Sequence, residues 1–432
     1  MFVSDCLDVN AQGHLTVGGC DAVSLAETFG TPLYVMDEPS IRGALREFKT
    51  AMDTYAANGG RVAYASKACS FKELYRIVNE EGCGADVVSG GELYTALQTG
   101  FPADRLYFHG NNKSDAELRM ALESGVGRIV VDNPEELRRL SAMAGAMGKT
   151  AAVYLRITPG VEAHTHSFIR TGQIDSKFGF TLENGEALRG AVEAVKLNAI
   201  TLKGFHCHIG SQIFDDEPFV EAADVMLTFM RQVRETTGVT VGELNLGGGF
   251  GAMYTSDDTP KSREAVVRRA AEAVEQKAAA LGFPCPFLVI EPGRSVVAEA
   301  GVTLYTVGHV KEIPGVRTYV SVDGGMTDNP RYILYQAPYT ALIANRAGAP
   351  ADKTVTIAGR CCESGDLLQE NAPLQACEPG DTLAVLATGA YNYSMASNYN
   401  RLPRPAVVMT KDGKARVVVR AETYEDLADR DE

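Results

Sequence analysis

Short apolar runs alternate with helix-patterned segments through the middle of the chain, between residues 60 and 292. Each run is β-branched or aliphatic and ends on a polar or glycine residue, and apolar residues then recur at helical spacing. The runs predict strands at 62–66, 85–89, 106–110, 128–132, 152–157, 203–208, 243–248 and 287–293. Eight strand–helix units in succession predict a (β/α)8 barrel of the TIM type.

Several helices in this region have recognisable starts. Ser114-Asp-Ala-Glu117 predicts a capping box, and Asn133 precedes a proline at the first helical position. Apolar residues recur at helical spacing over 217–235 and 262–281. These signals strengthen the assignment of alternating strands and helices.

Beyond residue 294 the pattern changes to strands, expected at 302–310, 316–323, 354–359, 381–388 and 406–419, the last turning at Asp412-Gly413. The N-terminal segment adds strand-like runs at 14–20 and 32–38, with a helix starting at Ser40. The acidic tail from Glu425 is expected to fray. We therefore expect an α/β chain with a barrel over 38–293. An all-β domain, a sandwich or a barrel, is formed by 294–432 and completed by 1–37.

Composition and net charge limit the classes of partner that the chain can bind. The 432 residues are 45% apolar and 22% charged, an ordinary globular profile. The formal charge of −14 argues against nucleic acid and anionic membranes, so an anionic ligand needs local arginines and backbone amides. The first residues lack a secretory signal pattern, and no apolar stretch approaches the ~20 residues of a membrane span. We expect a cytoplasmic protein. Nine scattered cysteines form no zinc-type CxxC pair.

The predicted strand ends carry the chemically most capable residues. In such barrels, reactions take place where the loops after the strands converge. The residues at these ends are Lys67, Asp86, His109, Arg156, His208, Gly247, Gly248, Gly249 and Glu291. A lysine at a strand end is, in isolation, a solvated terminus. Because other chemically capable residues are predicted at the same strand ends, Lys67 is a candidate reactive amine.

A glycine-rich stretch, Gly247-Gly-Gly-Phe-Gly251, follows the seventh predicted strand. Glycines let the backbone approach a ligand and aim amide N–H groups at it. The loops after strands 7 and 8 are the usual phosphate site of such barrels. The stretch also fits a loose dinucleotide-binding pattern through Ala252, but the polar MYTSDDTPK follows where that pattern needs an apolar helix. The context favours phosphate binding, and a purely structural turn stays open.

Glu291-Pro-Gly-Arg294 follows the eighth predicted strand. Alone, it is typical of a turn with an incidental ion pair. Together with a strand-end lysine and a phosphate loop, it matches the needs of pyridoxal phosphate: an amine for attachment, donors for the phosphate and a partner for the ring nitrogen. A carboxylate at that nitrogen keeps it protonated, which makes the ring a strong electron acceptor. Arg294 adds positive charge for an anion.

Two HxH pairs, His164/His166 and His206/His208, open a metal-hydrolase alternative, because strand residues i and i+2 face the same way. No carboxylate-rich ligand set accompanies them at the strand ends. For His208, the strand-end position followed by Ile-Gly-Ser211 favours an imidazole that faces the cofactor ring.

Six motifs, in order, resemble the diaminopimelate decarboxylase family, one of the alanine-racemase-like, fold type III decarboxylases that use pyridoxal phosphate. The motifs are YASKA around Lys67, HIGSQ at 208–212, GGGFG at 247–251, EPGRS at 291–295, CESGD at 362–366 and GAY at 389–391. The resemblance covers nearly the whole chain, from TPLYVMDE at 31–38 to SMASNYN at 394–400.

The resemblance implies a role for each site residue. Lys67 holds the cofactor covalently, His208 stacks on its ring and Glu291 pairs with its nitrogen. The residues that hold the phosphate or lie close to it are Ser211, Gly247, Gly248, Gly249, Gly293, Arg294 and Tyr391. The residues that bind the substrate are Arg294, Arg331, Tyr335, Glu363 and Tyr391. The family's site is shared across a homodimer, which implies that Cys362 and Glu363 complete the partner's pocket. Lys67 and Cys362 are both candidates to return a proton to Cα.

The implied reaction is the decarboxylation of meso-2,6-diaminopimelate to L-lysine and CO2, the last step of lysine biosynthesis. Glu363 matches the distal ammonium of this substrate, and Arg331 with Tyr335 its distal carboxylate. A buried arginine left unpaired by a shorter diamine costs roughly 3–5 kcal/mol, about a hundredfold or more in discrimination.

Departures from the family pattern are small: Cys69 stands where the family usually has Asn, and 326–335 differs somewhat from its commonest form. The rival functions are decarboxylation of ornithine, lysine or carboxynorspermidine on the same fold, and a non-catalytic protein that carries the cofactor.

Overall fold

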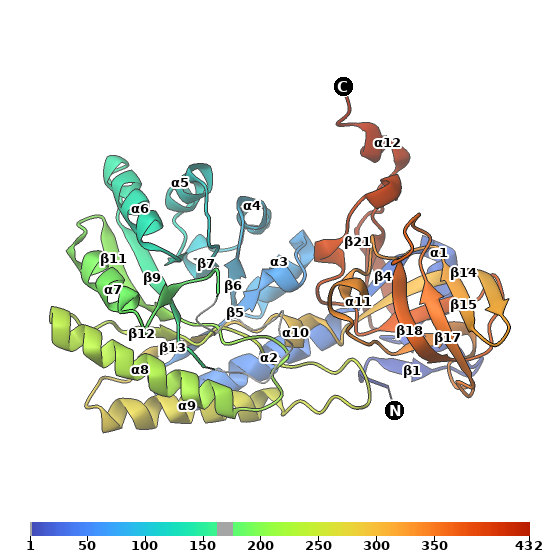
Figure 1. Cartoon of the computed structure of the whole chain (residues 1–432), viewed down its shortest axis with the longest axis horizontal. Coiled ribbons are helices and arrows are strands. Elements are labelled where there is room, and N and C mark those ends of the chain that lie inside the picture. The colour runs from blue at the N-terminus through green and yellow to red at the C-terminus, as the bar shows by residue number, and fades with distance from the viewer. Residues whose placement is uncertain (1, 162–175) are drawn as a thin grey trace. The chain divides into compact units, whose positions relative to one another are not determined.

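The computed structural model describes residues 2–161 and 176–432 (Figure 1). They form two compact units. The barrel unit comprises Ala44–Gly251 and Pro260–Gly293, and the sheet unit comprises Met1–Gly43, Ala252–Thr259 and Arg294–Glu432. Relative to the predicted division at 38 and 294, residues 38–43 and 252–259 fall in the sheet unit. In the described part of the chain, no helix is both long and apolar enough to cross a bilayer.

The barrel unit contains the eight predicted parallel strands. They are β5 (Gly60–Ala65), β6 (Gly84–Val87), β7 (Leu106–Phe108), β8 (Arg128–Val131), β9 (Ala151–Thr158), β11 (Ile200–His206), β12 (Glu243–Asn245) and β13 (Phe287–Ile290). Strands β13 and β5 pair, and β8 pairs with β9, so the sheet closes on itself. A short strand, β10 (Phe180–Thr181), adds to β9 in parallel. The predicted (β/α)8 barrel is confirmed.

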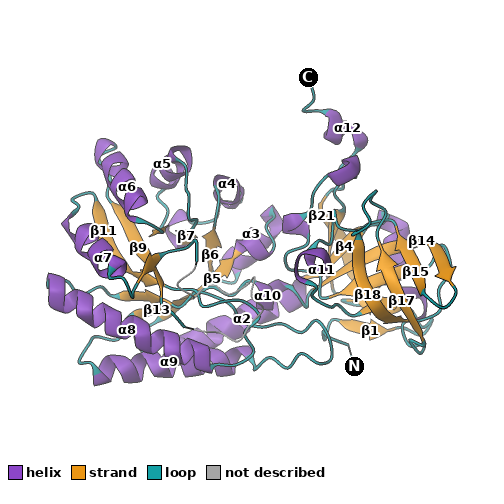
Figure 2. Cartoon of the chain, viewed as in Figure 1, coloured by secondary structure: helices purple, strands orange, loops and turns teal. Residues whose placement is uncertain are grey.

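A helix follows each barrel strand, and the helices surround the strands (Figure 2). In chain order they are α3 (Lys72–Glu80), α4 (Gly90–Leu97), α5 (Asp115–Ser124), α6 (Pro134–Ala146), α7 (Glu186–Lys196), α8 (Glu217–Thr237), α9 (Arg263–Ala280) and the single turn α10 (Arg294–Val297). The long helix α2 (Glu38–Tyr55) precedes β5. The structure confirms the capping box at Ser114 and the Asn133 cap before Pro134.

Alternation along the strands decides which side chains face the barrel interior. A buried cluster inside the barrel contains Tyr107 and Tyr154, with ring centroids 5.9 Å apart. On β11, Phe205 packs against Phe229 of α8 at 4.8 Å between ring centroids, so its neighbour His206 points inward. On β11, the outward packing of Phe205 thus places the polar His206 in the interior of the barrel.

The sheet unit is built on a nine-stranded sheet. Its strands are β4 (Leu33–Asp37), β14 (Gly301–Ile313), β15 (Arg317–Val322), β16 (Ala341–Ile343), β17 (Lys353–Ala358), β18 (Leu367–Leu374), β19 (Thr382–Leu386), β20 (Ala406–Lys411) and β21 (Lys414–Val419). The N-terminal strand β4 pairs with both β14 and β20. The N-terminal segment therefore completes this sheet, as predicted.

Smaller elements complete the sheet unit. A three-stranded sheet contains β1 (Leu7–Val9), β2 (Leu15–Val17) and β3 (Cys20–Asp21), and the helices are α1 (Ala22–Phe29), α11 (Arg331–Tyr335) and α12 (Tyr424–Ala428). Two predictions need correction. The tail does not fray at Glu425, because Thr423 caps α12 through a capping box, and α2 begins at Glu38 instead of Ser40.

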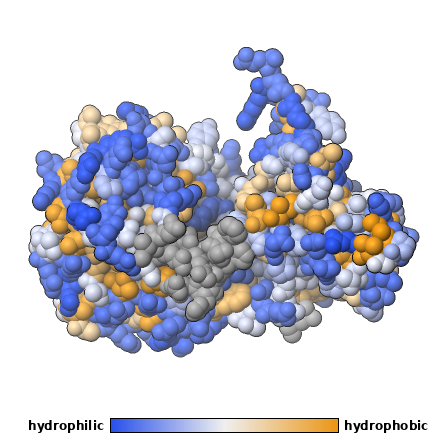
Figure 3. All heavy atoms as spheres, viewed as in Figure 1, coloured by the Kyte–Doolittle hydropathy of each residue, from blue (hydrophilic) through white to orange (hydrophobic). Residues whose placement is uncertain are grey.

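The surface is mainly hydrophilic on the face drawn in Figure 3, with apolar residues gathered in places. Seven large apolar side chains are exposed among the described residues. Five of them belong to the sheet unit: Val316, Leu334, Tyr399, Val417 and Tyr424. Exposed apolar residues are candidates for contact with a partner.

Candidate active site

A cavity of about 360 Å³ lies at the strand ends of the barrel unit. Its lining residues are Lys67, Asp86, Val88, His109, Gly110, Asn111, Arg156, Phe178, His206, His208 and Glu291. All six charged or imidazole-bearing side chains predicted at the strand ends are therefore brought together here. The volume is within the usual range for sites that bind small molecules.

Lys67 lies in a single 3-10 turn, Ser66–Ala68, directly after β5. It is exposed, although the residues on either side of it are buried. Its Nζ has no hydrogen bond or ion pair with any residue that the structure describes, so this amine at the cavity is available to a ligand.

Glu291, directly after β13, is a buried carboxylate with 5% exposure and three hydrogen-bond partners, two imidazoles and an amide. Asn245 Nδ2 donates to Oε1 at 2.6 Å, His109 Nε2 lies 2.8 Å from Oε1, and His206 Nε2 lies 3.1 Å from Oε2. Burial alone would raise the pKa of Glu291, but the two imidazoles hold it well below its ordinary range. Within the described chain, no lysine or arginine lies within ion-pair distance of this anion.

The two histidines on β11 and directly after it are neutral at physiological pH. Burial lowers the pKa of His206 to about 4. Burial, together with the charges of Lys67 and Arg156, holds the pKa of His208 well below its ordinary value. The Gly248 amide donates to His208 Nδ1 at 3.3 Å, which leaves the hydrogen of the neutral ring on Nε2.

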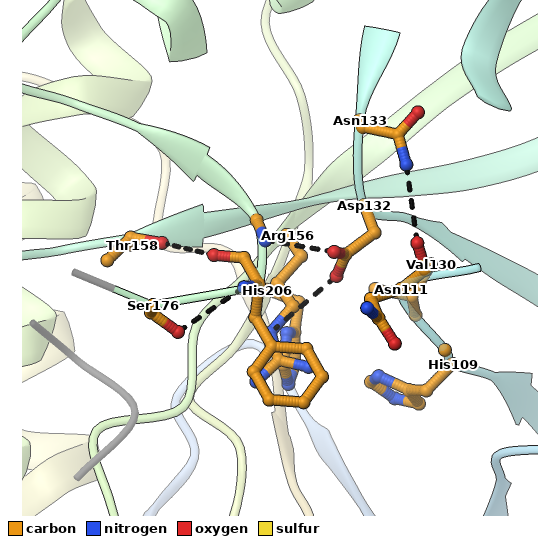
Figure 4. A network of polar contacts seen from close by, with 12 residues as sticks. His109, Asn111, Val130, Asp132, Asn133, Arg156, Thr158, Ser176 and His206 are labelled. Atoms are coloured by element: carbon orange, nitrogen blue, oxygen red, sulfur yellow. Dashed lines mark hydrogen bonds and ion pairs between the residues drawn. The ribbon is translucent and has the colours of Figure 1, made fainter. Parts of the chain in front are cut away.

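Asp86 and Arg156 complete the polar lining. Burial raises the pKa of Asp86 to about 6, against the opposing effect of His109, and its Oδ1 has no hydrogen-bond partner among the described residues. The guanidinium of Arg156 lies 4.1 Å from the centre of the Phe178 ring, and its Nε lies 4.0 Å from Asp132 Oδ1 (Figure 4). Arg156 is thus a half-buried cation that contacts one ring and one carboxylate.

The glycine loop after β12 packs against the neighbouring strand ends. A Cβ at Gly248 would come within 2.1 Å of the Glu291 carbonyl oxygen, and one at Gly247, where φ is +71°, within 2.4 Å of the Cys207 carbonyl oxygen. Only glycine fits this close approach. The loop therefore presents backbone rather than side chains, which is the property required of a phosphate cradle. No helix follows until Arg263, so the dinucleotide pattern lacks its helix.

The sheet unit contains the predicted arginines. Arg331, at the start of α11, is buried with 6% exposure, and its guanidinium lies 4.1 Å from the centre of the Tyr254 ring. Arg294 is also buried, and its guanidinium lies 4.7 Å from the ring centre of Tyr391, whose φ is +61°. Tyr335 is half-buried at the end of α11.

Cys362 and Glu363 are exposed on a turn between β17 and β18. The buried carboxylate of Asp366 fixes this turn by accepting hydrogen bonds from the amides of Cys361 at 2.7 Å and Met326 at 2.6 Å. The loop that contains Cys362 is thereby tied to the segment that leads into α11.

The barrel unit's residues fit pyridoxal phosphate. Lys67 offers an unengaged amine, Glu291 an ionised carboxylate for a protonated ring nitrogen, and the glycine loop close backbone. The metal alternative takes a different form from the predicted one. His206 groups with His109 and Glu291, and these three ligand atoms lie within 4.8 Å of one another. Both imidazoles already hydrogen-bond to the carboxylate, whereas His164 and His166 lie outside the described residues.

Comparison with known proteins agrees with this fit. Residues 39–298 match the family model "Pyridoxal-dependent decarboxylase, pyridoxal binding domain". The matched stretch contains every barrel strand and every residue that lines the cavity. Fold and site thus define a pyridoxal phosphate-dependent decarboxylase, a carboxy-lyase. Full-length relatives narrow this class further.

A curated diaminopimelate decarboxylase of Bacillus subtilis is 54% identical over 431 residues, covering 100% of this chain and 98% of the relative. The crystal structure of diaminopimelate decarboxylase from M. jannaschii with L-lysine superposes with a TM-score of 0.93 at 36% identity, covering 100% and 99% of the two chains. The chain belongs to the diaminopimelate decarboxylase family. A lysine/ornithine decarboxylase from Vibrio vulnificus, solved with putrescine, is more distant, with a TM-score of 0.76 and 26% identity over 90% and 99%.

Sequence reasoning missed some residues of the site. The sequence patterns do not indicate Asn245 or Asn111, and they indicate His206 only as a candidate metal ligand. Asn245 lies two residues before Gly247, so the period-2 rule applied to ELNLGG could have placed it inward. The predicted phosphate residues are not among those that line this cavity, and their role stays a prediction: Ser211, Gly247, Gly248, Gly249, Gly293, Arg294 and Tyr391. The sequence patterns do not indicate Tyr254.

Proposed function

We propose that this chain removes CO2 from meso-2,6-diaminopimelate to give L-lysine, the last step of lysine biosynthesis. One observation carries the chemical part: the buried, ionised Glu291 is held by two imidazoles and an amide, with no lysine or arginine of the described chain at ion-pair distance. Such a carboxylate is suited to hold a proton on a ring nitrogen. Racemases of the same fold place an arginine at this position, so an acid here favours decarboxylation.

The barrel unit's residues divide the work at the cofactor. Bound pyridoxal phosphate supplies an electron-accepting ring that takes up the electron pair left when CO2 departs. Lys67 would hold the cofactor covalently through its amine. The neutral His208 would lie against the ring, and the residues that would hold or approach the phosphate are Ser211, Gly247, Gly248, Gly249, Gly293, Arg294 and Tyr391. Glu291 would keep the ring nitrogen protonated.

The sheet unit's residues select the substrate. Arg331 and Tyr335 bind the distal carboxylate, Glu363 binds the distal ammonium, and Arg294 and Tyr391 also contact the substrate. Arg331 is buried with no carboxylate at ion-pair distance in the described chain, which supports an anionic ligand at this position. A diamine without that carboxylate would leave Arg331 uncompensated, at a cost of roughly 3–5 kcal/mol.

We propose that the active enzyme is a homodimer whose partner supplies Cys362 and Glu363 to each site. Their exposure on the sheet unit, with Leu334 and Tyr399 exposed on the same unit, supports this assignment. The test mixes equal amounts of Lys67→Ala and Glu363→Ala subunits. Random re-pairing should restore up to about a quarter of wild-type activity, because half of the dimers carry one intact site. No restoration in verified mixed dimers would contradict a shared site.

The proton that replaces CO2 at Cα comes from Lys67 or Cys362. Cys362→Ser distinguishes them. If the thiol donates, the variant should lose product formation more than CO2 release in a single turnover. Equal loss of both would assign the proton to Lys67.

We place the protein in the cytoplasm. All nine cysteines are free, including three that are only partly buried. Free thiols are typical of proteins in a reducing compartment. Fractionation of cells with an antibody to the chain tests this placement, and recovery outside the cytoplasmic fraction would overturn it.

The direct test of the reaction incubates purified holoenzyme with meso-diaminopimelate. We expect stoichiometric CO2 and a single lysine enantiomer, identified as L by chiral chromatography. Parallel incubations with ornithine, lysine and carboxynorspermidine test the rival substrates. Faster turnover of any of these would replace the proposed substrate, and binding of cofactor without turnover of all four would favour the non-catalytic carrier.

A further inference from the structure

Tyr254 touches both buried arginines of the sheet unit. Arg294 Nη1 donates a hydrogen bond to the Tyr254 hydroxyl at 2.6 Å, and the Arg331 guanidinium lies over the Tyr254 ring at 4.1 Å. Tyr339 also faces Arg331, at 5.2 Å, and Tyr391 faces Arg294. Within the described residues, Tyr254 is the side chain that has a hydrogen bond to one arginine and a ring contact with the other.

No negatively charged side chain of the described residues lies close to Arg331. Its Nη1 is buried and, among the residues that the structure describes, has neither a hydrogen-bond partner nor a carboxylate within ion-pair distance. Aromatic faces attract a guanidinium but do not compensate the loss of water around a buried cation. A planar guanidinium with an unpartnered buried nitrogen suits a carboxylate ligand, the anion whose geometry matches it.

Tyr254 is itself held in place by its backbone. Its amide donates to Asp258 Oδ2 at 2.9 Å, and Thr340 Oγ1 donates to its carbonyl oxygen at 2.9 Å. Its ring also meets the edge of Tyr339 at 5.5 Å between centroids. A ring fixed at several points can set the orientation of the guanidinium that stacks on it.

We propose that Tyr254 is a positioning residue for substrate specificity: it orients Arg331 toward the carboxylate of the ligand while fixing Arg294 through its hydroxyl. The ligand class is a diamine that carries a carboxylate at its far end. This inference rests on the proposed function, because it assumes that Arg331 receives that carboxylate. It adds a residue that acts on ligand selection through the Arg331 guanidinium.

The test compares two ligands of the holoenzyme that differ by one carboxylate, L-lysine and 1,5-diaminopentane, by calorimetric titration. Wild type should bind L-lysine at least tenfold more tightly. Tyr254→Phe keeps the ring but loses the hydroxyl, so the ratio of the two affinities should fall about threefold. Tyr254→Leu also loses the ring and should reduce the ratio by about tenfold or more, the usual effect of losing a charge-assisted contact.

Tyr332→Phe is the matched control. It lies beside Arg331 on α11, but its hydroxyl bonds to Glu370 at 3.2 Å, so the ratio should stay within twofold of wild type. A structural role for Tyr254 would weaken both ligands equally. Parallel weakening, an unchanged ratio or a wild type that fails to prefer L-lysine would each overturn the proposal. If Tyr254→Leu does not fold, Tyr254→Phe alone decides the matter.

The decarboxylation assay on wild type distinguishes failure of the proposed function from failure of the positioning role of Tyr254. If wild type releases no CO2 from meso-diaminopimelate, the proposed function fails. If it does so and the affinity ratio does not respond to Tyr254, only the positioning role fails.

Discussion

Two regions of the molecule each keep one buried charge with no oppositely charged lysine, arginine or carboxylate of the described chain at ion-pair distance. In the barrel unit, Glu291 is surrounded by two imidazoles and an amide. In the sheet unit, Arg331 is surrounded by two tyrosine rings. Both environments orient the charge. A ligand can then supply the missing charge, a protonated ring nitrogen for Glu291 and a carboxylate for Arg331.

A third buried site shows what an internally compensated charge looks like. Lys113 Nζ bonds to Glu136 Oε1 at 2.6 Å and to the carbonyl oxygens of Gly110 and Val130 at 2.8 and 2.7 Å. Both side chains are about 1% exposed. A pair of this kind holds a loop to its neighbours and has no place for a ligand. The contrast separates structural charges from functional ones.

The largest expected effect is that of Lys67→Ala, because it removes the amine that attaches the cofactor. Activity should fall at least about a thousandfold, and the visible absorption of the bound cofactor should shift or disappear. Lys72→Ala, on the exposed face of α3, is the control and should resemble wild type. A yellow, active Lys67 variant would refute the assignment.

Glu291→Gln should be the next most damaging change. The carboxylate that retains a proton on the ring nitrogen is lost, and a charge-assisted hydrogen bond is worth roughly 1.5–3 kcal/mol, about ten- to 150-fold in kcat/KM. Asn245→Ala removes the 2.6 Å donor to Glu291 and the acceptor of the Gly247 amide, but keeps the carboxylate, so it should cost less than Glu291→Gln. Cofactor affinity, measured by equilibrium dialysis, should follow the same order. A Glu291→Gln enzyme at wild-type rate would contradict the comparison.

Glu136→Gln tests whether the buried Lys113–Glu136 pair stabilises the fold. The change leaves Lys113 buried without its counter-charge, so unfolding should become easier by about 3–5 kcal/mol and the melting temperature should fall by several degrees. Arg331→Met removes a charge that the fold does not compensate, and the melting temperature of the apoprotein should be unchanged or higher. The comparison fails if Arg331→Met destabilises the apoprotein as much as Glu136→Gln does.

Asp86→Asn should have the smallest effect, and that effect should depend on pH. Burial raises the folded-state pKa of Asp86 to about 6, above the unfolded value of about 3.9. The folded protein therefore binds the proton more tightly, and stability is lost as the pH rises from about 4 through 6. Asn cannot ionise, so the apoprotein variant should gain up to about 3 kcal/mol relative to wild type at pH 8 and almost nothing at pH 4. Melting curves across this range check the trend, which would be contradicted by a gain confined to low pH.

The barrel could be predicted from sequence because each of its strands is a short apolar run ended by a polar or glycine residue. The prediction of the sheet unit is less complete. It lacks β18, because LLQENAPL mixes polar and apolar residues. It also lacks α12, a short helix that begins at a cap formed by Thr423. Strand and helix termini that depend on one side chain are weakly encoded in a hydrophobic pattern.

The structure brings the predicted strand-end residues to one cavity, while their roles stay predictions, and the sequence did not indicate residues that act through other residues. Lys67 and Glu291 are visible in sequence because the strand pattern places them at the C-terminal ends of the barrel. Asn245 becomes recognisable only when its amide is seen 2.6 Å from Glu291, and Tyr254 only when its ring is seen under Arg331. Such contacts join residues far apart in the chain, and no local spacing encodes them.

The most direct test of the account is covalent mapping of the cofactor. Holoenzyme reduced with borohydride and digested should yield one labelled peptide, with pyridoxal phosphate on Lys67. A label on any other lysine, or no label in an active enzyme, would contradict the account.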